Sequence, residues 1–349
     1  MKHSRLLLVL VMAAIIYTAA SQATASADSA GGTLFSTYCI SCHNTVPTTD
    51  PRLVGASASK ITNAIVTIPQ MIGNSAIHSL TSAQIQSISG YITGAGLSTN
   101  WTMVGVGDFN KDGNIEILWR DMINGYNYLW LMNGTSVTGG VFLPTLADTN
   151  TWLVEGVGDF NNDGYADILW RNVSTGENMI WLMNGATVQS YVSLPTLSDR
   201  NWIVGAIGDF NGDGYQDILW RHLVNGYNAI WYLNGTTFSS ADSLPALSDE
   251  SWVIGGAADM DHDGHTDVLW RNKTAGYNLF WDLIGTNVGN YYLMTQVTDP
   301  GWTMIAATKP DSNGYVRIYW RNQNAGSTVI WTMNGATLVS SAALPAFGP

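Results

Sequence analysis

The chain has 349 residues, of which 46% are hydrophobic and 11% are charged, and its formal net charge is −12. This length supplies apolar material for two or three domains with cores of their own, and so low a charged fraction excludes disorder driven by charge. The negative sign excludes a basic nucleic-acid-binding surface, and two cysteines exclude a scaffold stapled by several disulfides.

Residues 1–27 have the three parts of a secretory signal peptide. Lys2 and Arg5 give a basic start, residues 6–20 form an apolar run, and Ala25-Ser26-Ala27 offers a small-residue cleavage site. An uncleaved membrane anchor is the alternative, although the apolar run is short for a membrane span. We therefore expect an exported protein, periplasmic or extracellular, with no transmembrane segment in the mature chain.

Residues 28–98 contain both cysteines and no tryptophan, and their pattern is helical. Apolar residues recur at helical spacing in two segments, namely Ile61, Ala64, Ile65 and Ile68 in the first and Ile85, Ile88 and Ile92 in the second. This pattern predicts a small all-α domain.

The motif Cys39-Ile40-Ser41-Cys42-His43 lies in this helical region. Two thiols at this spacing add to the two vinyl groups of a porphyrin, and the adjacent histidine binds the iron. A thioredoxin-like dithiol needs a βαβ context, which the region lacks, and a zinc site needs a second pair of ligands. The motif therefore predicts one covalent haem c, with Cys39 and Cys42 forming the thioethers and His43 as the proximal ligand.

Residues 30–93 resemble a small class I cytochrome c domain, through this motif and the closing helix 81–92. In that family a methionine before the last helix is the distal iron ligand. Met71 is the only methionine between residues 28 and 98, so the resemblance implies that Met71 is the distal ligand. A buried core methionine and ligation by His78 are the alternatives.

Residues 99–349 form an internal repeat. Five units begin at tryptophans about 50 residues apart, a period typical of propellers, solenoids and arrays; these are Trp101, Trp152, Trp202, Trp252 and Trp302. Each unit has a second tryptophan, always followed by arginine, and a third, which together account for all fifteen tryptophans of the chain.

Four short apolar runs in each unit predict four strands. In the second unit they cover residues 152–157, 166–171, 178–182 and 188–194. Asn-Gly, a strong hairpin signal, separates the third and fourth runs in four units, whereas the fourth unit has Ile284-Gly285. Four antiparallel strands make one propeller blade, so residues 99–349 are predicted to be an all-β propeller of five four-stranded blades.

A nine-residue acidic loop joins the first two runs in the first four units. Oxygen-bearing side chains occupy positions 1, 3, 5 and 9, and glycine occupies position 6, so the loop presents the hard oxygen ligands that calcium prefers. The predicted calcium ligands are Asp108, Asn110, Asp112 and Glu116; Asp159, Asn161, Asp163 and Asp167; Asp209, Asn211, Asp213 and Asp217; and Asp259, Asp261, Asp263 and Asp267. An EF-hand is excluded because tryptophan stands where its glutamate would be.

These loops resemble the calcium-binding FG-GAP (VCBS-type) repeats of integrin-like propellers, in which the calcium is structural. The resemblance implies about four Ca²⁺ ions. In the fifth unit Lys309 and Arg317 occupy positions 1 and 9, so we expect no calcium there and ion pairs with Asp311 instead.

The repeated Trp-Arg pairs admit two interpretations. They are either inter-blade packing groups or the walls of five pockets for glycans or anions.

The sequence as a whole predicts a mono-haem c-type electron-transfer protein rather than an enzyme. Its partner would be a redox protein, and the propeller would be a docking module. A propeller lectin or adhesin with an accessory haem domain, binding a glycan or cell-surface ligand, is the alternative. A quinohaemoprotein-type dehydrogenase is less well supported, because such enzymes have larger propellers than residues 99–349 can form.

Overall fold

The computed structural model describes residues 101–146 and 151–345, which form twenty β-strands. The predicted signal peptide (1–27) and haem domain (28–98) lie outside the described residues. So do their site residues Cys39, Cys42, His43 and Met71. These assignments therefore stay predictions.

Each unit of the repeat contributes four consecutive strands. The first contains β1 (Trp101–Gly107), β2 (Glu116–Asp121), β3 (Asn127–Asn133) and β4 (Ser136–Leu143). The second contains β5 (Trp152–Gly158), β6 (Asp167–Asn172), β7 (Asn178–Asn184) and β8 (Thr187–Leu194). The third contains β9 (Trp202–Gly208), β10 (Asp217–His222), β11 (Asn228–Asn234) and β12 (Thr237–Leu244). The fourth contains β13 (Trp252–Ala258), β14 (Asp267–Asn272), β15 (Asn278–Ile284) and β16 (Asn287–Met294). The fifth contains β17 (Trp302–Ala307), β18 (Val316–Asn322), β19 (Ser327–Asn334) and β20 (Thr337–Ala343).

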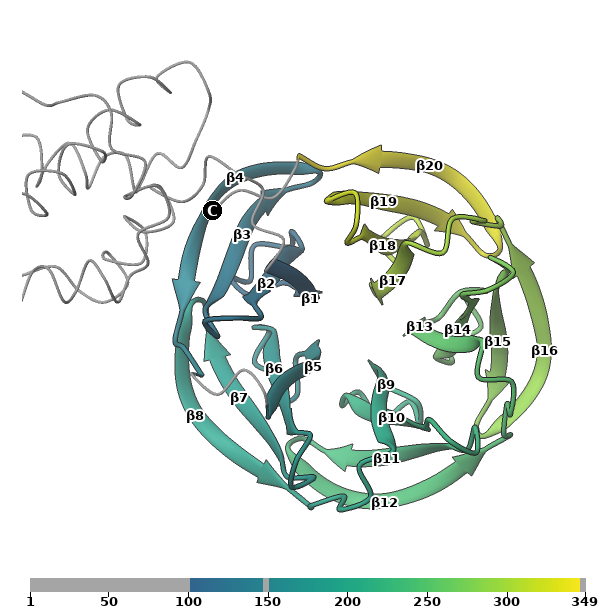
Figure 1. Cartoon of the computed structure of the whole chain (residues 1–349), viewed down its shortest axis with the longest axis horizontal. Coiled ribbons are helices and arrows are strands. Elements are labelled where there is room, and N and C mark those ends of the chain that lie inside the picture. Colours follow the sequence, from purple (N-terminus) through teal and green to yellow (C-terminus); the bar gives the residue numbers. More distant parts are fainter. Residues whose placement is uncertain (1–100, 147–150, 346–349) are drawn as a thin grey trace, which may run out of the picture. The chain divides into compact units, whose positions relative to one another are not determined.

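The strands of each unit form one antiparallel four-stranded sheet in sequence order. The five sheets are arranged as blades around a common axis, with β1, β5, β9, β13 and β17 innermost and β4, β8, β12, β16 and β20 outermost (Figure 1). This arrangement confirms the predicted propeller of five four-stranded blades.

The hairpin between the third and fourth strands differs from the predicted Asn-Gly turn. Asn133 pairs with Ser136, so Gly134 and Thr135 are the two central residues. Of these two, only Gly134 has a positive φ, at 60°, which is the pattern of a turn with glycine first. Ile284 therefore replaces asparagine in the fourth unit without changing the turn, because Gly285 keeps a φ of 63°.

The core lies between the blades. The indoles Trp119, Trp170, Trp220, Trp270 and Trp320 are at most 1% exposed. In one cluster Leu118 and Leu129 of the first blade pack with Ile168 and Trp170 of the second. Each blade therefore buries its apolar faces against its neighbours, so no blade has a complete core alone.

Within the described residues, no helix is long and apolar enough to span a membrane.

Candidate metal centres

The second acidic loop, between β5 and β6, folds around its own side-chain oxygens. The Asp159 carboxylate accepts hydrogen bonds from the backbone N–H groups of Asp163 (3.1 Å) and Gly164 (2.9 Å). Asn161 Oδ1 accepts from Asp163 N–H (3.1 Å), and Asp163 Oδ1 accepts from Tyr165 N–H (2.9 Å). These Asx-type turns draw the residues at positions 1, 3 and 5 into one small loop.

The other three acidic loops repeat this geometry. Asp108, Asp209 and Asp259 each accept from the N–H of the glycine at position 6, at 2.8–3.1 Å. The residue at position 4 has a left-handed backbone in every loop; these residues are Lys111 (φ 62°), Asn162 (58°), Gly212 (74°) and His262 (68°). Four segments far apart in the sequence thus adopt the same local shape.

The position-9 carboxylates are fully buried and join each loop to its sheet; they are Glu116, Asp167, Asp217 and Asp267, each 0% exposed. In the second blade, Asp167 Oδ2 accepts from Phe160 N–H in the loop (3.0 Å). Its Oδ1 accepts from Met183 N–H on β7 (2.8 Å). Asp217 and Asp267 make the same pair of bonds.

Burial and neighbouring carboxylates oppose ionisation at position 9. Burial, helped by the negative charges of Asp159 and Asp163, raises the pKa of Asp167 to about 7 against the opposing effect of its backbone hydrogen bonds. For the same reasons the pKa is raised to about 6 for Asp217 and to about 7 for Asp267. A cation bound in the loop would reverse this effect, because it favours the charged form of each carboxylate.

The fourth loop brings its carboxylates closest together. Oxygen atoms of Asp259, Asp261 and Asp267 lie within 4.8 Å of one another. Asp282 on β15 forms a second such group with Asp261 and Asp263. Sequence reasoning missed Asp282, because it lies outside the loop in sequence and the other units have Leu131, Leu182, Tyr232 and Thr332 at its place.

The donor set of these four loops fits calcium. Carboxylate, amide and peptide oxygens are hard ligands, and a Ca²⁺ ion takes six to eight of them in a flexible arrangement. In the fourth loop, the predicted ligands at positions 1, 3 and 9 (Asp259, Asp261 and Asp267) lie together. The full sets of calcium ligands stay a prediction.

The fifth loop has a different construction. Asp311 closes a tight turn, its N–H donating to Tyr315 O (2.9 Å) and its carbonyl accepting from Gly314 N–H (2.8 Å). Backbone hydrogen bonds from Tyr315 and Asn313 hold the pKa of Asp311 below its usual range, and the positive charge of Arg317 adds to this effect. The sequence predicted ion pairs from Lys309 and Arg317 to Asp311, but residues 151–345 contain no such ion pair. Backbone hydrogen bonds hold this turn instead.

Neighbouring loops also contact one another. Lys111 Nζ, in the first loop, donates to Asp163 O in the second (2.6 Å). Asn162 Nδ2, in the second loop, donates to Gly214 O in the third (3.0 Å). These contacts could not be predicted from the sequence, since a 50-residue repeat does not show which side chain reaches the next unit.

The Trp-Arg pairs link one blade to the next. Each guanidinium lies over the second tryptophan of the following blade, with its central carbon 4.7–5.2 Å from the ring centroid. Arg171 also donates to the carbonyls of Gly176 (3.2 Å) and Leu197 (3.0 Å). All five arginines are buried, at most 7% exposed, so these groups are inter-blade packing groups, and Arg221 also lines a cavity between the third and fourth blades.

Comparison with protein families identifies FG-GAP-like repeats in this chain. Residues 108–170, 159–220 and 209–270 match that repeat family, and each match runs from one acidic loop to the buried tryptophan of the next blade. The predicted resemblance is thus confirmed over residues 108–270. No curated protein matches the chain.

Solved structures with similar folds are distant. A nidogen/laminin complex aligns with a TM-score of 0.44 and 12% identity, covering 70% of this chain and 81% of that chain. A calcium-binding protein, regucalcin, from Agrobacterium tumefaciens aligns at 0.42 and 10% identity, covering 71% and 77%. Glutaminyl cyclase from Myxococcus xanthus aligns at 0.40 and 11% identity, covering 71% and 93%. At such scores these similarities carry no argument about activity.

Proposed function

We propose that this chain is an exported mono-haem c-type electron-transfer protein with a calcium-stabilised propeller as its docking module. The observation that carries the haem assignment is the Cys39–His43 motif, which lies behind a signal-peptide pattern in residues 1–27. A haem bound there would supply one-electron redox chemistry. Cys39 and Cys42 would hold it covalently, and His43 and Met71 would bind its iron.

The four acidic loops support the calcium part of this proposal. Each fastens the first two strands of a blade through a buried position-9 carboxylate, and each gathers several oxygen ligands, with Lys111 as a cation at the second loop. Calcium would therefore stabilise the blades rather than react. A propeller held rigid in this way offers a broad surface for a redox protein partner.

The optical spectrum of the full chain, expressed with haem-maturation machinery, tests the haem assignment. We expect haem that stays with the chain after denaturation, and in the oxidised form a methionine–iron charge-transfer band. Cys42→Ser should reduce covalent attachment, and Met71→Ala should remove the charge-transfer band. His78→Ala is the matched control and should leave the band in place.

Haem that washes off the denatured wild-type chain would contradict the proposal. Covalent haem without a methionine–iron band in the wild type would keep the haem assignment but reassign the distal ligand, with His78 as the alternative.

One observation favours a lectin or adhesin as the second candidate function. A cavity of about 240 Å³ lies between the third and fourth blades, where Trp252 lines it together with Arg221, Glu250 and Lys273. An indole beside charged side chains is a common way to bind a sugar ring, through its apolar face and its hydroxyls. A glycan array probed with wild type and Trp252→Ala tests this: binding that the variant loses supports it, and a blank array rejects it.

A further inference from the structure

Glu155 on β5 has a position unlike any other charged residue of the propeller. It is the only charged side chain on the five innermost strands β1, β5, β9, β13 and β17. The corresponding residues of the other units are Val104, Gly205, Gly255 and Ile305. The repeat therefore does not require a carboxylate here, and neither the haem nor the calcium assignment uses it.

Glu155 lines the central channel of the propeller. The innermost strands face one another around the axis of the ring (Figure 1), and a cavity of about 80 Å³ lies between them. All five strands contribute to its wall, through residues such as Val106, Val157, Ile207 and Ile305. Among the residues that line this cavity, Glu155 is the only charged one.

Peptide groups form much of the channel wall. Each innermost strand pairs with one neighbour only, so alternate peptide groups on its free edge have no partner within the sheet. The strands also approach closely, since a Cβ on Gly156 would lie 2.5 Å from Ile207 Cγ1. Carbonyl oxygens are thus available beside the single carboxylate.

The surroundings of Glu155 leave its charge without a direct counter-ion. The backbone N–H of Val204 donates a hydrogen bond to the carboxylate, and Arg171 is the cation whose charge acts on it. However, Arg171 donates to Gly176 O, Leu197 O and Asn178 Oδ1, and no ion pair within 4.0 Å joins it to Glu155 in the described part of the chain. Burial raises the pKa of Glu155 to about 7.

We propose that the central channel binds a monovalent metal cation, held by the Glu155 carboxylate and by peptide carbonyl oxygens of the innermost strands. One negative charge among neutral groups matches one positive charge, whereas a Ca²⁺ site gathers several carboxylates. Carboxylate, carbonyl and water oxygens are suitable ligands for such a hard cation. The cavity has room for the ion with one or two waters, at roughly 30 Å³ for each water.

Thermal unfolding of the full chain tests this proposal, because it reports on the channel directly. All fifteen tryptophans lie in the propeller region, so tryptophan fluorescence follows that part alone. The protein is kept at pH 8 with saturating Ca²⁺ and constant ionic strength, while Na⁺ or K⁺ replaces N-methyl-D-glucamine, a cation too large for the channel. We expect Na⁺ or K⁺ to raise the wild-type Tm by about 2–4 °C.

Glu155→Gln keeps the shape of the side chain and should abolish this rise. Glu177→Gln, at an exposed glutamate with the same change in charge, is the matched control and should respond like the wild type. An equal response in Glu155→Gln and wild type, or no response in the wild type, would overturn the proposal.

Crystals of the wild type soaked in Rb⁺ give a second measurement that needs no variant. We expect an anomalous peak on the channel axis beside the Glu155 carboxylate. A channel without such a peak would reject the proposal even if Glu155→Gln failed to fold. The haem and calcium assignments are independent of this site and would stand in either case.

Discussion

The guanidinium of Arg321 on β18 lies 4.9 Å from the centroid of the Trp119 ring on β2, and this contact joins the last blade to the first. All four strands of the fifth blade come from one unit, β17–β20, so no strand from the first unit completes it. Gln323 Nε2 adds a hydrogen bond to Trp101 O at 3.1 Å. Side chains at the seam, rather than a shared sheet, close the ring.

Removing this cation–π contact should destabilise the propeller. Arg321→Ala is expected to cost about 2 kcal/mol, because a desolvated cation–π pair is lost and the carbonyl of Gly326 loses its donor. Urea unfolding followed by tryptophan fluorescence measures the change. Arg200→Ala removes an exposed arginine and should change the unfolding free energy by less than about 0.5 kcal/mol. Equal effects of both substitutions would show that the seam contact is not stabilising.

Calcium should bind at four sites. Isothermal titration of the chelator-treated protein is expected to give four equivalents, one for each acidic loop, and calcium should raise the Tm. Asp213→Ala removes an exposed ligand at position 5 and should lower the stoichiometry by one. Asp311→Ala in the fifth loop is the control and should leave it unchanged. Five equivalents, or none, would contradict the assignment of the loops.

Lys111 should weaken calcium binding at the second loop. Its ammonium bonds to Asp163 O and thus places a positive charge beside a predicted calcium ligand. Lys111→Asn keeps a residue that tolerates the left-handed backbone, as Asn162 does in the second loop. We expect up to about fivefold tighter binding at one site at low salt, an effect that shrinks as salt screens the charge. Unchanged affinity at low salt would contradict this expectation.

Glu155 should make stability depend on pH when the only monovalent cation is N-methyl-D-glucamine. Its folded-state pKa of about 7 lies above the ordinary value of 4.5, so the folded protein holds the proton more tightly. The contribution of Glu155 to the free energy of unfolding is therefore fully present below pH 4.5. It is lost as the pH rises toward 7, and the loss is about 3 kcal/mol at most. The comparison of wild type with Glu155→Gln by urea unfolding at several pH values isolates this loss from other titrating groups. If the free energy of unfolding depends on pH in the same way in both proteins, Glu155 does not cause this loss.

The hairpin of the fourth blade tests which turn residue matters. Gly285→Ala forces alanine to a φ of 63° and should destabilise the protein by about 1–2 kcal/mol. Ile284→Asn restores the Asn-Gly dipeptide of the other units at a residue 57% exposed, and it should be close to neutral. A large gain from Ile284→Asn would show that asparagine itself favours the turn.

The regular features of the propeller were predictable because they repeat. The spacing from Trp101 to Trp302 defined five units, and alternating apolar runs with glycine turns defined four strands in each. The acidic loops were found because their ligands are neighbours in the sequence. These signals are local, and five copies reinforce them.

Features that depend on contacts between units were missed. Lys111 of the first loop reaches the second loop, and Glu155 enters the channel, each at a position where the other units carry different residues. When the units are compared in sequence alone, such residues cannot be distinguished from substitutions that have no effect. Only the packing of one blade against the next reveals what they contact.

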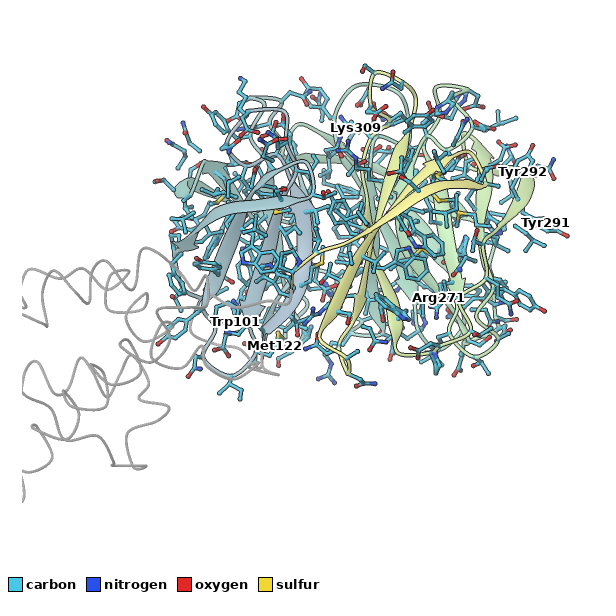
Figure 2. All side chains as sticks on the ribbon, turned by 90° about the horizontal axis from the view of Figure 1, so that it is seen from above. Trp101, Met122, Arg271, Tyr291, Tyr292 and Lys309 are labelled. Atoms are coloured by element: carbon cyan, nitrogen blue, oxygen red, sulfur yellow. The ribbon has the colours of Figure 1, made fainter. Side chains whose placement is uncertain are left out.

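The unlike fifth loop has a consequence for any partner that docks on the loop face. Figure 2 shows Lys309, the first residue of that loop, at the end of the propeller opposite Met122. The loops of the first four units begin with an aspartate, and the loop of the fifth unit begins with a lysine. A ring of five equal units would offer a partner five equivalent rotational settings. Because one of the five positions carries the opposite charge, these settings are no longer equivalent. A partner that recognises Lys309 would dock in one defined orientation around the propeller axis.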